Sequence, residues 1–394
     1  MNSNIYTEVG YKQAHKYGND VCGDVILTRK VKEENRTIVV LSDGLGSGIK
    51  ANVLANMTAS MTMNFTTLNE PVQRTADIII QTLPVDKKRK ISFASFSTAD
   101  VDSNGKVRLL EYGNPKAILI KHGILCELDR RKLSILGINN VHQTLYESEF
   151  IAAEGDRLLM FSDGVSQSGI GRQDMPFGWE REEIYQYLQY LIRQNPGMSA
   201  SEMASKVVNR SIGNDIFKAQ DDITCSSIYF REPRKMLICT GPPYNHENDL
   251  LLADKVKSFE GTRVVCGGTT AQIISRLLNE EIEVDMLSGR MGLPPIGTME
   301  GVNLVTEGIL TIGRVEVLLE EMQQGDDLED SPAGDILKLI REHDSIEFLV
   351  GTRVNEAHQD PSLPVELEIR RNVVKRIARL LEEKFLKKVK ISFL

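Results

Sequence analysis

The sequence lacks the features that mark several large classes of protein. Its 394 residues include only five cysteines, an odd number with no C-x-x-C pair: Cys22, Cys126, Cys225, Cys239 and Cys266. We therefore expect buried free thiols rather than a disulfide framework or a zinc knuckle. No run approaches the roughly 20 apolar residues that cross a bilayer, and residues 1–10 show no secretory signal. The expected location is the cytoplasm, with no membrane partner.

An excess of positive charge is also absent. Lys and Arg number 47 against 55 Asp and Glu, which gives a formal net charge of −8. Nucleic-acid binding needs a basic face for phosphate contacts, so no nucleic-acid partner is expected. The 41% of hydrophobic residues is typical of a soluble protein with real cores. A chain of this length usually forms two domains.

The N-terminal part alternates short strands with helices. β-Branched residues at 25–31 and 37–41 predict a hairpin that carries Asp43 at its exit. Helices are expected over 51–68, 75–83, 181–193 and 200–210, and further strands over 91–101, 107–112, 117–121, 158–161 and 223–230.

A charged segment with a proline, residues 231–235, marks the expected boundary between two domains, 1–231 and 236–394. Beyond it, strands alternate with helices, which predicts an α/β layer domain. Strands are expected over 236–240, 263–266, 346–350 and 389–394, and helices over 247–259, 269–278 and 365–385. The stretch 289–301, rich in Gly and Pro, predicts an irregular loop.

Two loops of this C-terminal part follow predicted strands. In CGGTTAQII, residues 266–274, two glycines precede a helix that Thr269 or Thr270 is placed to cap. Capping is the simpler interpretation, but the amides of the same helix start also suit an anion. CTGPPYN, residues 239–245, is a second loop of this kind. Together the two loops are placed to line one ligand crevice.

Aspartates stand beside strand ends at several places in the N-terminal part. One such aspartate is an ordinary turn former, but Asp43 and Asp163 share the frame Ser-Asp-Gly after an apolar run. Asp24 and the pair Asp221-Asp222 also adjoin predicted strands. If these strand ends converge, the like charges raise one another's pKa unless a cation is present.

The type of ligand indicates the metal. All the candidate ligands are carboxylate oxygens, and oxygen-only sites favour Mg²⁺ or Mn²⁺. Two such ions together can activate a water for in-line displacement at phosphorus. Gly44, which follows Asp43, leaves room for its own carbonyl or a ligand beside a metal.

The order of these segments resembles a known family. Gly23-Asp24, SDGLGSGIKA at 42–51, YGNP at 112–115, FSDGV at 161–165 and DDIT at 221–224 occur as in the metal-dependent PPM (protein phosphatase 2C-like) serine/threonine phosphatases. They look most like the branch typified by the stage II sporulation protein E phosphatase, over residues 5–231. The resemblance implies an α+β fold: an α-β-β-α sandwich with a binuclear Mn/Mg centre at one edge, followed here by the smaller α/β layer domain.

The resemblance also implies roles for particular residues. Asp24 and Asp43 would bridge or ligate the metals, and Gly44 would contribute its backbone carbonyl. Asp163 and Asp221 would hold the second metal of the pair. Asp222 stands where the fold often has an asparagine, and we place it behind the ligands. An N-terminal arginine that grips phosphate has no clear counterpart, since Lys12 and Lys16 are the only Lys or Arg residues before Asp24.

The implied function is a cytosolic serine/threonine protein phosphatase whose metal-bridged water attacks the phosphoryl group. Substrates of this branch are phosphorylated regulators of the anti-sigma antagonist kind, and the C-terminal domain would regulate through a small ligand or through homodimer formation. Two alternatives stay open: a catalytically inactive phosphatase-like scaffold whose C-terminal domain binds a ligand or partner, and a small-molecule phosphatase. The clustered aspartates argue against a scaffold, because their repulsion is costly without metal.

Overall fold

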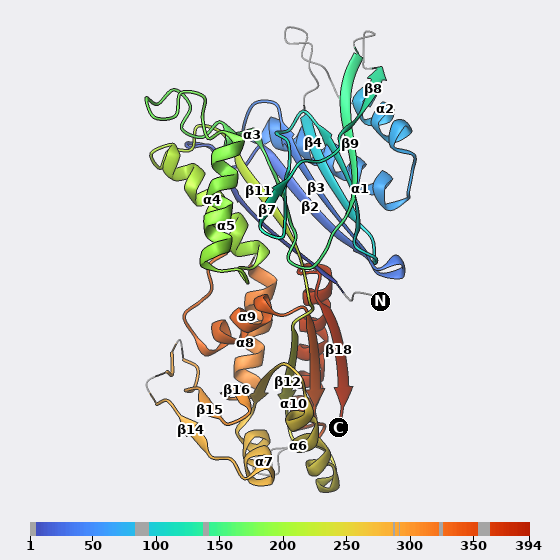
Figure 1. Ribbon diagram of the computed structural model, residues 1–394. Coiled ribbons are helices and arrows are strands. Elements are labelled where there is room, and N and C mark those ends of the chain that lie inside the picture. Colours follow the sequence, from blue (N-terminus) through green and yellow to red (C-terminus); the bar gives the residue numbers. More distant parts are fainter. Residues whose placement is uncertain are drawn as a thin grey trace. The chain divides into compact units, whose positions relative to one another are not determined.

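The computed structural model describes residues 5–82, 94–136, 142–286, 288–290, 292–322, 326–353 and 363–394. The chain divides into two compact units, Met1–Glu232 and Pro233–Leu394 (Figure 1). Among the described residues, no helix is both long and apolar enough to cross a membrane. All five cysteines are free thiols.

Two antiparallel sheets form the centre of the first unit. One sheet has six strands in the order β2-β3-β4-β5-β9-β8 and the other has five in the order β1-β11-β10-β6-β7. The strands of the first are Asp24–Val31 (β2), Arg36–Gly44 (β3), Ala94–Val101 (β4), Lys106–Tyr112 (β5), His142–Ile151 (β9) and Arg131–Leu136 (β8). The strands of the second are Tyr6–Ala14 (β1), Ile223–Arg231 (β11), Arg157–Phe161 (β10), Ile118–Lys121 (β6) and Ile124–Cys126 (β7).

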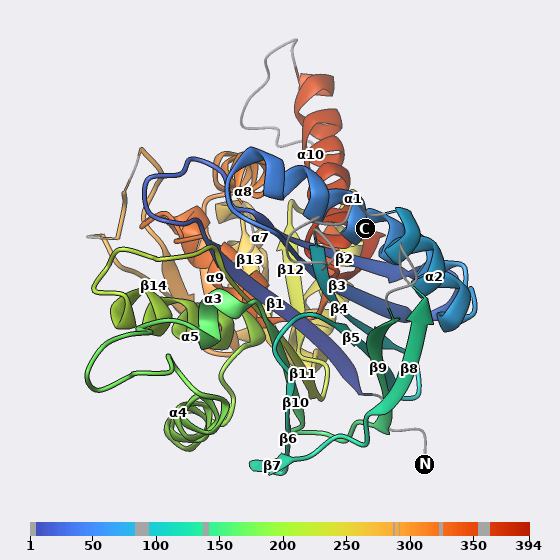
Figure 2. The same ribbon diagram turned by 90° about the horizontal axis from the view of Figure 1, so that it is seen from above.

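Helices cover the outer face of each sheet. Their bounds are Ile49–Thr67 (α1), Val72–Thr82 (α2), Asp163–Ser166 (α3), Arg181–Gln194 (α4) and Ala200–Asn214 (α5). Alternation along β3 explains the layering: Val39 packs between the sheets, whereas Ile38 and Val40 pack against α1. Figure 2 shows α1 and α2 outside one sheet and α4 and α5 outside the other. The expected α-β-β-α sandwich is confirmed.

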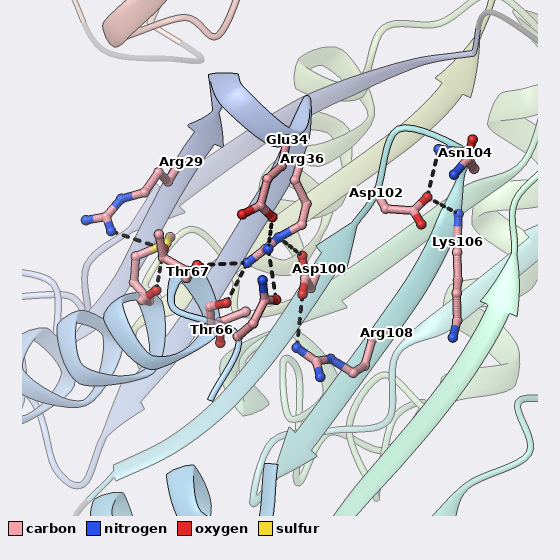
Figure 3. Close-up of polar contacts among 12 residues, drawn as sticks. Arg29, Glu34, Arg36, Thr66, Thr67, Asp100, Asp102, Asn104, Lys106 and Arg108 are labelled. Carbon is pink, nitrogen blue, oxygen red and sulfur yellow. Dashed lines mark hydrogen bonds and ion pairs between the residues drawn. The ribbon is translucent and has the colours of Figure 1, made fainter. Parts of the chain in front are cut away.

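A buried arginine ties the six-stranded sheet to the end of α1 (Figure 3). Arg36, at the start of β3, is only 6% exposed. Its Nη2 donates to the Thr66 carbonyl at 2.5 Å, and its Nε forms an ion pair with Asp100 at 2.9 Å. Asp100 also pairs with Arg108 at 3.1 Å. The guanidinium thus satisfies a carbonyl at the C-terminus of the helix, where the macrodipole favours a cation.

The second unit is built on a seven-stranded sheet in the order β14-β15-β16-β13-β12-β17-β18. The five strands from β16 to β18 are mutually parallel, whereas β14 and β15 run antiparallel. Their bounds are Lys235–Thr240 (β12), Thr262–Cys266 (β13), Ile282–Val284 (β14), Gly297–Met299 (β15), Val302–Thr306 (β16), Ser345–Val350 (β17) and Lys388–Phe393 (β18).

Helices cover both faces of this sheet, as parallel strands require. Asp249–Ser258 (α6) and Gly268–Leu278 (α7) pack on one face through Leu252 and Ile274. The other face holds Ile309–Glu321 (α8), Pro332–Glu342 (α9) and Leu363–Glu383 (α10), which contribute Ile312, Ile336 and Ile377. The expected α/β layer architecture is therefore present.

Some local expectations were wrong. Neither Thr269 nor Thr270 caps α7, because the N-cap residue is Gly267 and the helix starts at Gly268. The stretch 289–301 is not wholly irregular, since Gly297–Met299 pairs with β14 and β16. Residues 83 and 91–93, at the ends of an expected helix and strand, and residue 291 lie outside the described residues.

The buried arginine gives a stability prediction. We expect Arg36→Met to lower the free energy of unfolding of the first unit by about 3 kcal/mol, because it leaves a buried carboxylate and a helix carbonyl poorly partnered. Arg131→Met, at a 70% exposed side chain paired with Glu147, should cost less than about 1 kcal/mol. Urea unfolding followed by Trp179 fluorescence measures both, since the only tryptophan of the chain lies in this unit. An equal loss of unfolding free energy in the two variants would contradict the stabilising role of Arg36.

Candidate metal centre

Asp24 and Asp43 lie side by side at one end of the six-stranded sheet. Asp24 opens β2, and Asp43 is the second-last residue of β3. The antiparallel register places the two residues directly opposite each other. Residues paired in this way share a face of the sheet, with Cβ atoms about 5 Å apart. The hairpin therefore presents two neighbouring carboxylates.

The other acidic residues come from the five-stranded sheet. Asp163 is the first residue of α3, just after β10, and Asp221 and Asp222 precede β11. The two segments are joined through Ser162 and Thr224. The Ser162 amide donates to the Thr224 carbonyl at 3.0 Å, and the Ser162 Oγ accepts from the Thr224 amide at 3.0 Å.

The structure brings the carboxylates of both sheets together. Burial raises the pKa of Asp43, and the charges of Asp24, Asp163 and Asp221 raise it further. The pKa of Asp24 is likewise raised by burial, and hydrogen bonds from Ser162 and Thr224 offset part of that shift. The pKa of Asp163 is raised by burial and then by Asp221. Electrostatic interactions therefore connect four of the predicted site residues: Asp24, Asp43, Asp163 and Asp221.

Asp222 lies behind this group, against the start of β2. Its side chain is only 3% exposed, and its Oδ1 accepts a hydrogen bond from the Lys16 amide at 2.9 Å. Its charge contributes to the raised pKa of Asp24. A Cβ on Gly23 would lie 2.7 Å from Asp222 Oδ2, so the close approach of Asp222 requires glycine at that position.

Two more glycines of the motifs have packing roles. A Cβ on Gly44 would lie 2.1 Å from the Ala51 carbonyl oxygen, and one on Gly164 would lie 2.1 Å from the Asp222 carbonyl oxygen. Real Cβ atoms do not approach oxygen so closely, so both positions exclude a side chain. The close packing of α1 on β3 accounts for Gly44 without a ligand, a requirement that the sequence did not reveal.

The donor set fits a hard cation, although its side chains are not arranged around one. Among the described residues, no group of three or more His, Cys, Asp or Glu side chains has the spacing to hold a metal ion. Instead, Asp43 shares a hydrogen bond with Asp163. Asp24 Oδ2 and Asp222 Oδ2 are buried without a hydrogen-bond partner. Buried carboxylate oxygens of this kind are costly unless a cation or donor meets them.

Neighbouring polar residues orient the acidic ones. Gln167 Nε2 donates to Asp163 Oδ2 at 2.8 Å, and Gln13 Nε2 donates to the Asp24 carbonyl at 3.2 Å. Burial raises the pKa of Asp221. Lys16, whose Nζ lies 4.0 Å from Asp221 Oδ1, offsets part of that rise. Sequence reasoning missed both glutamines. Gln167 follows Asp163 by one helical turn, a spacing that was available as a signal, whereas nothing local marked Gln13.

An α-β-β-α sandwich with acidic side chains gathered at one edge is the architecture that the resemblance to PP2C-type phosphatases implies. The family model of stage II sporulation protein E (SpoIIE) matches residues 33–231, just over half of the 394 residues. The chain belongs to the SpoIIE family. Asp24 precedes the matched range, and Asp43, Asp163 and Asp221 fall within it.

Solved structures show similar folds at low identity. The phosphatase domain of SpoIIE from Bacillus subtilis has 17% identity and a TM-score of 0.42, over 58% of this chain and 94% of that one. A second SpoIIE structure contains the PP2C domain and a fragment of the regulatory domain. It has 18% identity and a TM-score of 0.46, over 58% of this chain and 64% of that one. The catalytic domain of PstP, in complex with 2 manganese ions, has 14% identity and a TM-score of 0.39, over 58% of this chain and 100% of that one. At these values the likeness concerns the fold alone. A comparison with curated proteins gave no match.

Crowding of the carboxylates gives a pH prediction for metal-free protein. The pKa values of Asp24 and Asp43 are raised in the folded state, so the folded state holds protons that the unfolded chain has released. Stability without metal therefore falls as the pH rises from about 4 through the raised values. We expect Asp43→Asn, in EDTA at about pH 8, to raise the melting temperature by roughly 2–4 °C for each kcal/mol that the folded wild-type chain loses by keeping a proton on Asp43. At about pH 5 the gain should shrink, because the Asp43 carboxyl takes up its proton there at little cost.

Thermal melting followed by Trp179 fluorescence measures this gain. The matched control is Asp102→Asn, which changes a half-buried turn aspartate that accepts hydrogen bonds from the amides of Asn104 and Lys106 (Figure 3). It should show no such pH-dependent gain. A melting temperature for Asp43→Asn that is equal to or below wild type at the higher pH would contradict the raised pKa of Asp43.

Proposed function

We propose that this protein is a serine/threonine protein phosphatase that depends on two Mn²⁺ or Mg²⁺ ions. The observation that carries the proposal is the acidic edge, where burial and the carboxylates of two sheets raise the pKa of Asp43, in a chain of the SpoIIE family. Such a cluster is ionised at neutral pH only when a cation neutralises it. Its donors are all oxygens, which suits Mn²⁺ and Mg²⁺.

Each residue of the edge has a proposed role. When bound, two divalent ions supply a water activated for in-line attack and neutralise charge on the phosphoryl group. Asp24, Asp43, the Gly44 carbonyl, Asp163 and Asp221 would hold those ions. Asp222 would lie behind these ligands, where its own Oδ1 accepts a hydrogen bond from the Lys16 amide. Gln167 orients Asp163 through the hydrogen bond at 2.8 Å.

Loss of the central carboxylates tests the activity. We expect Mn²⁺-dependent hydrolysis of p-nitrophenyl phosphate and of a phosphoserine peptide by the wild-type protein. Asp43→Asn and Asp163→Asn should each lower kcat/KM by roughly 100-fold or more, because each removes a charge that a cation needs. Asp102→Asn, the turn variant, should keep full activity, and circular dichroism should show that all three fold. Wild-type protein without metal-dependent hydrolysis would favour the inactive scaffold.

Lys16 is the cation that we propose to meet the substrate. Its side chain is 41% exposed, and Nζ lies beside Asp221, so it can turn to a phosphoryl oxygen without losing a buried partner. We expect Lys16→Gln to raise KM for a phosphopeptide several-fold, as one charge-assisted hydrogen bond predicts, and to change kcat less. Steady-state kinetics at saturating Mn²⁺ separates the two constants. An unchanged KM would remove Lys16 from the substrate site.

We propose phosphorylated protein regulators of the anti-sigma antagonist kind as substrates, acted on in the cytoplasm. The unit 236–394 would regulate the phosphatase domain 1–231 through a small ligand or through homodimer formation. A panel of phosphopeptides set against sugar phosphates discriminates a protein phosphatase from a small-molecule phosphatase, since only the former prefers the peptides.

A further inference from the structure

The C-terminal unit has the topology of a sheet that binds ligands at one edge. Its parallel strands follow the spatial order β16-β13-β12-β17-β18, with β12 first in the chain and in the middle of the five. Connections leave β12 and β17 toward opposite faces, because α6 packs on one face and α10 on the other. In sheets wound in this way, ligands bind beyond the carboxyl ends of the strands. Glycines lie close after four of those ends: Gly241, Gly267, Gly308 and Gly351.

The start of α7, just beyond β13, is open. Its N-cap residue is Gly267, whose φ of 125° few side-chain-bearing residues adopt and which makes no side-chain cap. The first intrahelical hydrogen bond runs from the Ala271 amide to the Gly267 carbonyl at 2.9 Å. The amides of Gly268, Thr269 and Thr270 therefore have no acceptor within the helix. Gly268 is exposed, and a Cβ on it would meet no atom of the described residues within 4 Å.

Thr270 provides a second, independent observation. Its side chain is 1% exposed, and its buried Oγ1 has no hydrogen-bond partner among the described residues. This hydroxyl points to the open loop, since Oγ1 lies 3.3 Å from the position that a Cβ on Gly267 would take. A buried hydroxyl without a partner is unfavourable. It is satisfied if an acceptor sits over Gly267 and the free amides.

The neighbouring helix offers an internal comparison. α8 also begins after a glycine, Gly308, and carries Thr311 at the position equivalent to Thr270, again buried and without a partner at Oγ1. Here, however, Glu307 Oε2 accepts from the Leu310 amide at 3.1 Å. A carboxylate thus already occupies the start of α8. The N-cap residue of α7 is a glycine and provides no such group.

The two helix starts adjoin, and an arginine lies at the same edge. A Cβ on Gly308 would be 3.4 Å from Gly267 Cα, so the positive ends of two helix dipoles come together there. One strand away, Arg370 Nη1 lies 2.6 Å from the position of a Cβ on Gly241, and Thr240 is paired with Cys266. The amides and the dipole of α7, with a guanidinium at the same edge, favour an anion, whereas Glu307 already meets the start of α8.

We propose that this edge binds the phosphoryl group of a small phosphorylated ligand, held by the amides of Gly268, Thr269 and Thr270 and by the Thr270 hydroxyl. The ligand is either a nucleotide or another phosphorylated metabolite, because both carry the group that the helix start recognises. The site lies wholly in residues 236–394 and does not depend on the phosphatase assignment.

The test is isothermal titration calorimetry on the full chain in excess EDTA, which keeps metal-dependent phosphate binding by the other unit out of the signal. Probes are inorganic phosphate, AMP, ADP and glucose 6-phosphate. Thr270→Val, which removes the hydroxyl and keeps the shape, should weaken binding of the best probe about tenfold. Thr311→Val is the matched control and should leave its affinity unchanged, because Glu307 already occupies that helix start.

Gly268→Asp provides a variant that loses binding without losing stability. The new carboxylate would take the place of the anion, in open space, and would complement the helix dipole. We expect no measurable binding of any probe and a melting temperature at or above wild type. Binding of AMP and ADP alone identifies a nucleotide site, and equal binding of all phosphate monoesters identifies a general phosphoryl site. No binding by wild type, or equal binding by Gly268→Asp, would overturn the proposal.

Discussion

Repulsion between buried carboxylates is the constraint on which the acidic edge depends. Burial and three neighbouring charges together raise the pKa of Asp43, and Asp24 is 3% exposed with an oxygen that has no partner. No arrangement of apolar contacts removes this cost at neutral pH. A divalent cation would remove it directly, so the proposed metal binding would be linked to the stability of this edge.

The rest of the sandwich brings that edge together with backbone contacts rather than long side chains. Two glycines allow this close approach. Gly44 lets α1 pack directly against β3, and Gly164 lets the backbone of Asp222 pack directly against the start of α3. Hydrogen bonds between the Ser162 and Thr224 segments then join the ends of β10 and β11. Backbone contacts hold the acidic residues in fixed positions, which the proposed metal centre requires.

Much of this was predictable from the sequence, because the strongest signals were local. The apolar runs beside the aspartates gave β3 and β10, and the alternation in the second part of the chain gave its helix-flanked sheet. The strand β1 was missed because residues 6–14 mix polar and apolar side chains, half-buried along most of its length. The reason for Gly44 was missed because it depends on Ala51 in another element. The absence of a threonine cap on α7 depends on where the helix begins, which local propensity sets only within a few residues.

The measurement that tests the central claim most directly is the number of Mn²⁺ ions bound per chain, by equilibrium dialysis at neutral pH. If the acidic side chains of the two sheets form a binuclear centre, the wild-type chain binds two ions, and Asp43→Asn loses at least one of them. Binding that is absent in the wild-type chain, or that is the same in both proteins, would contradict the account.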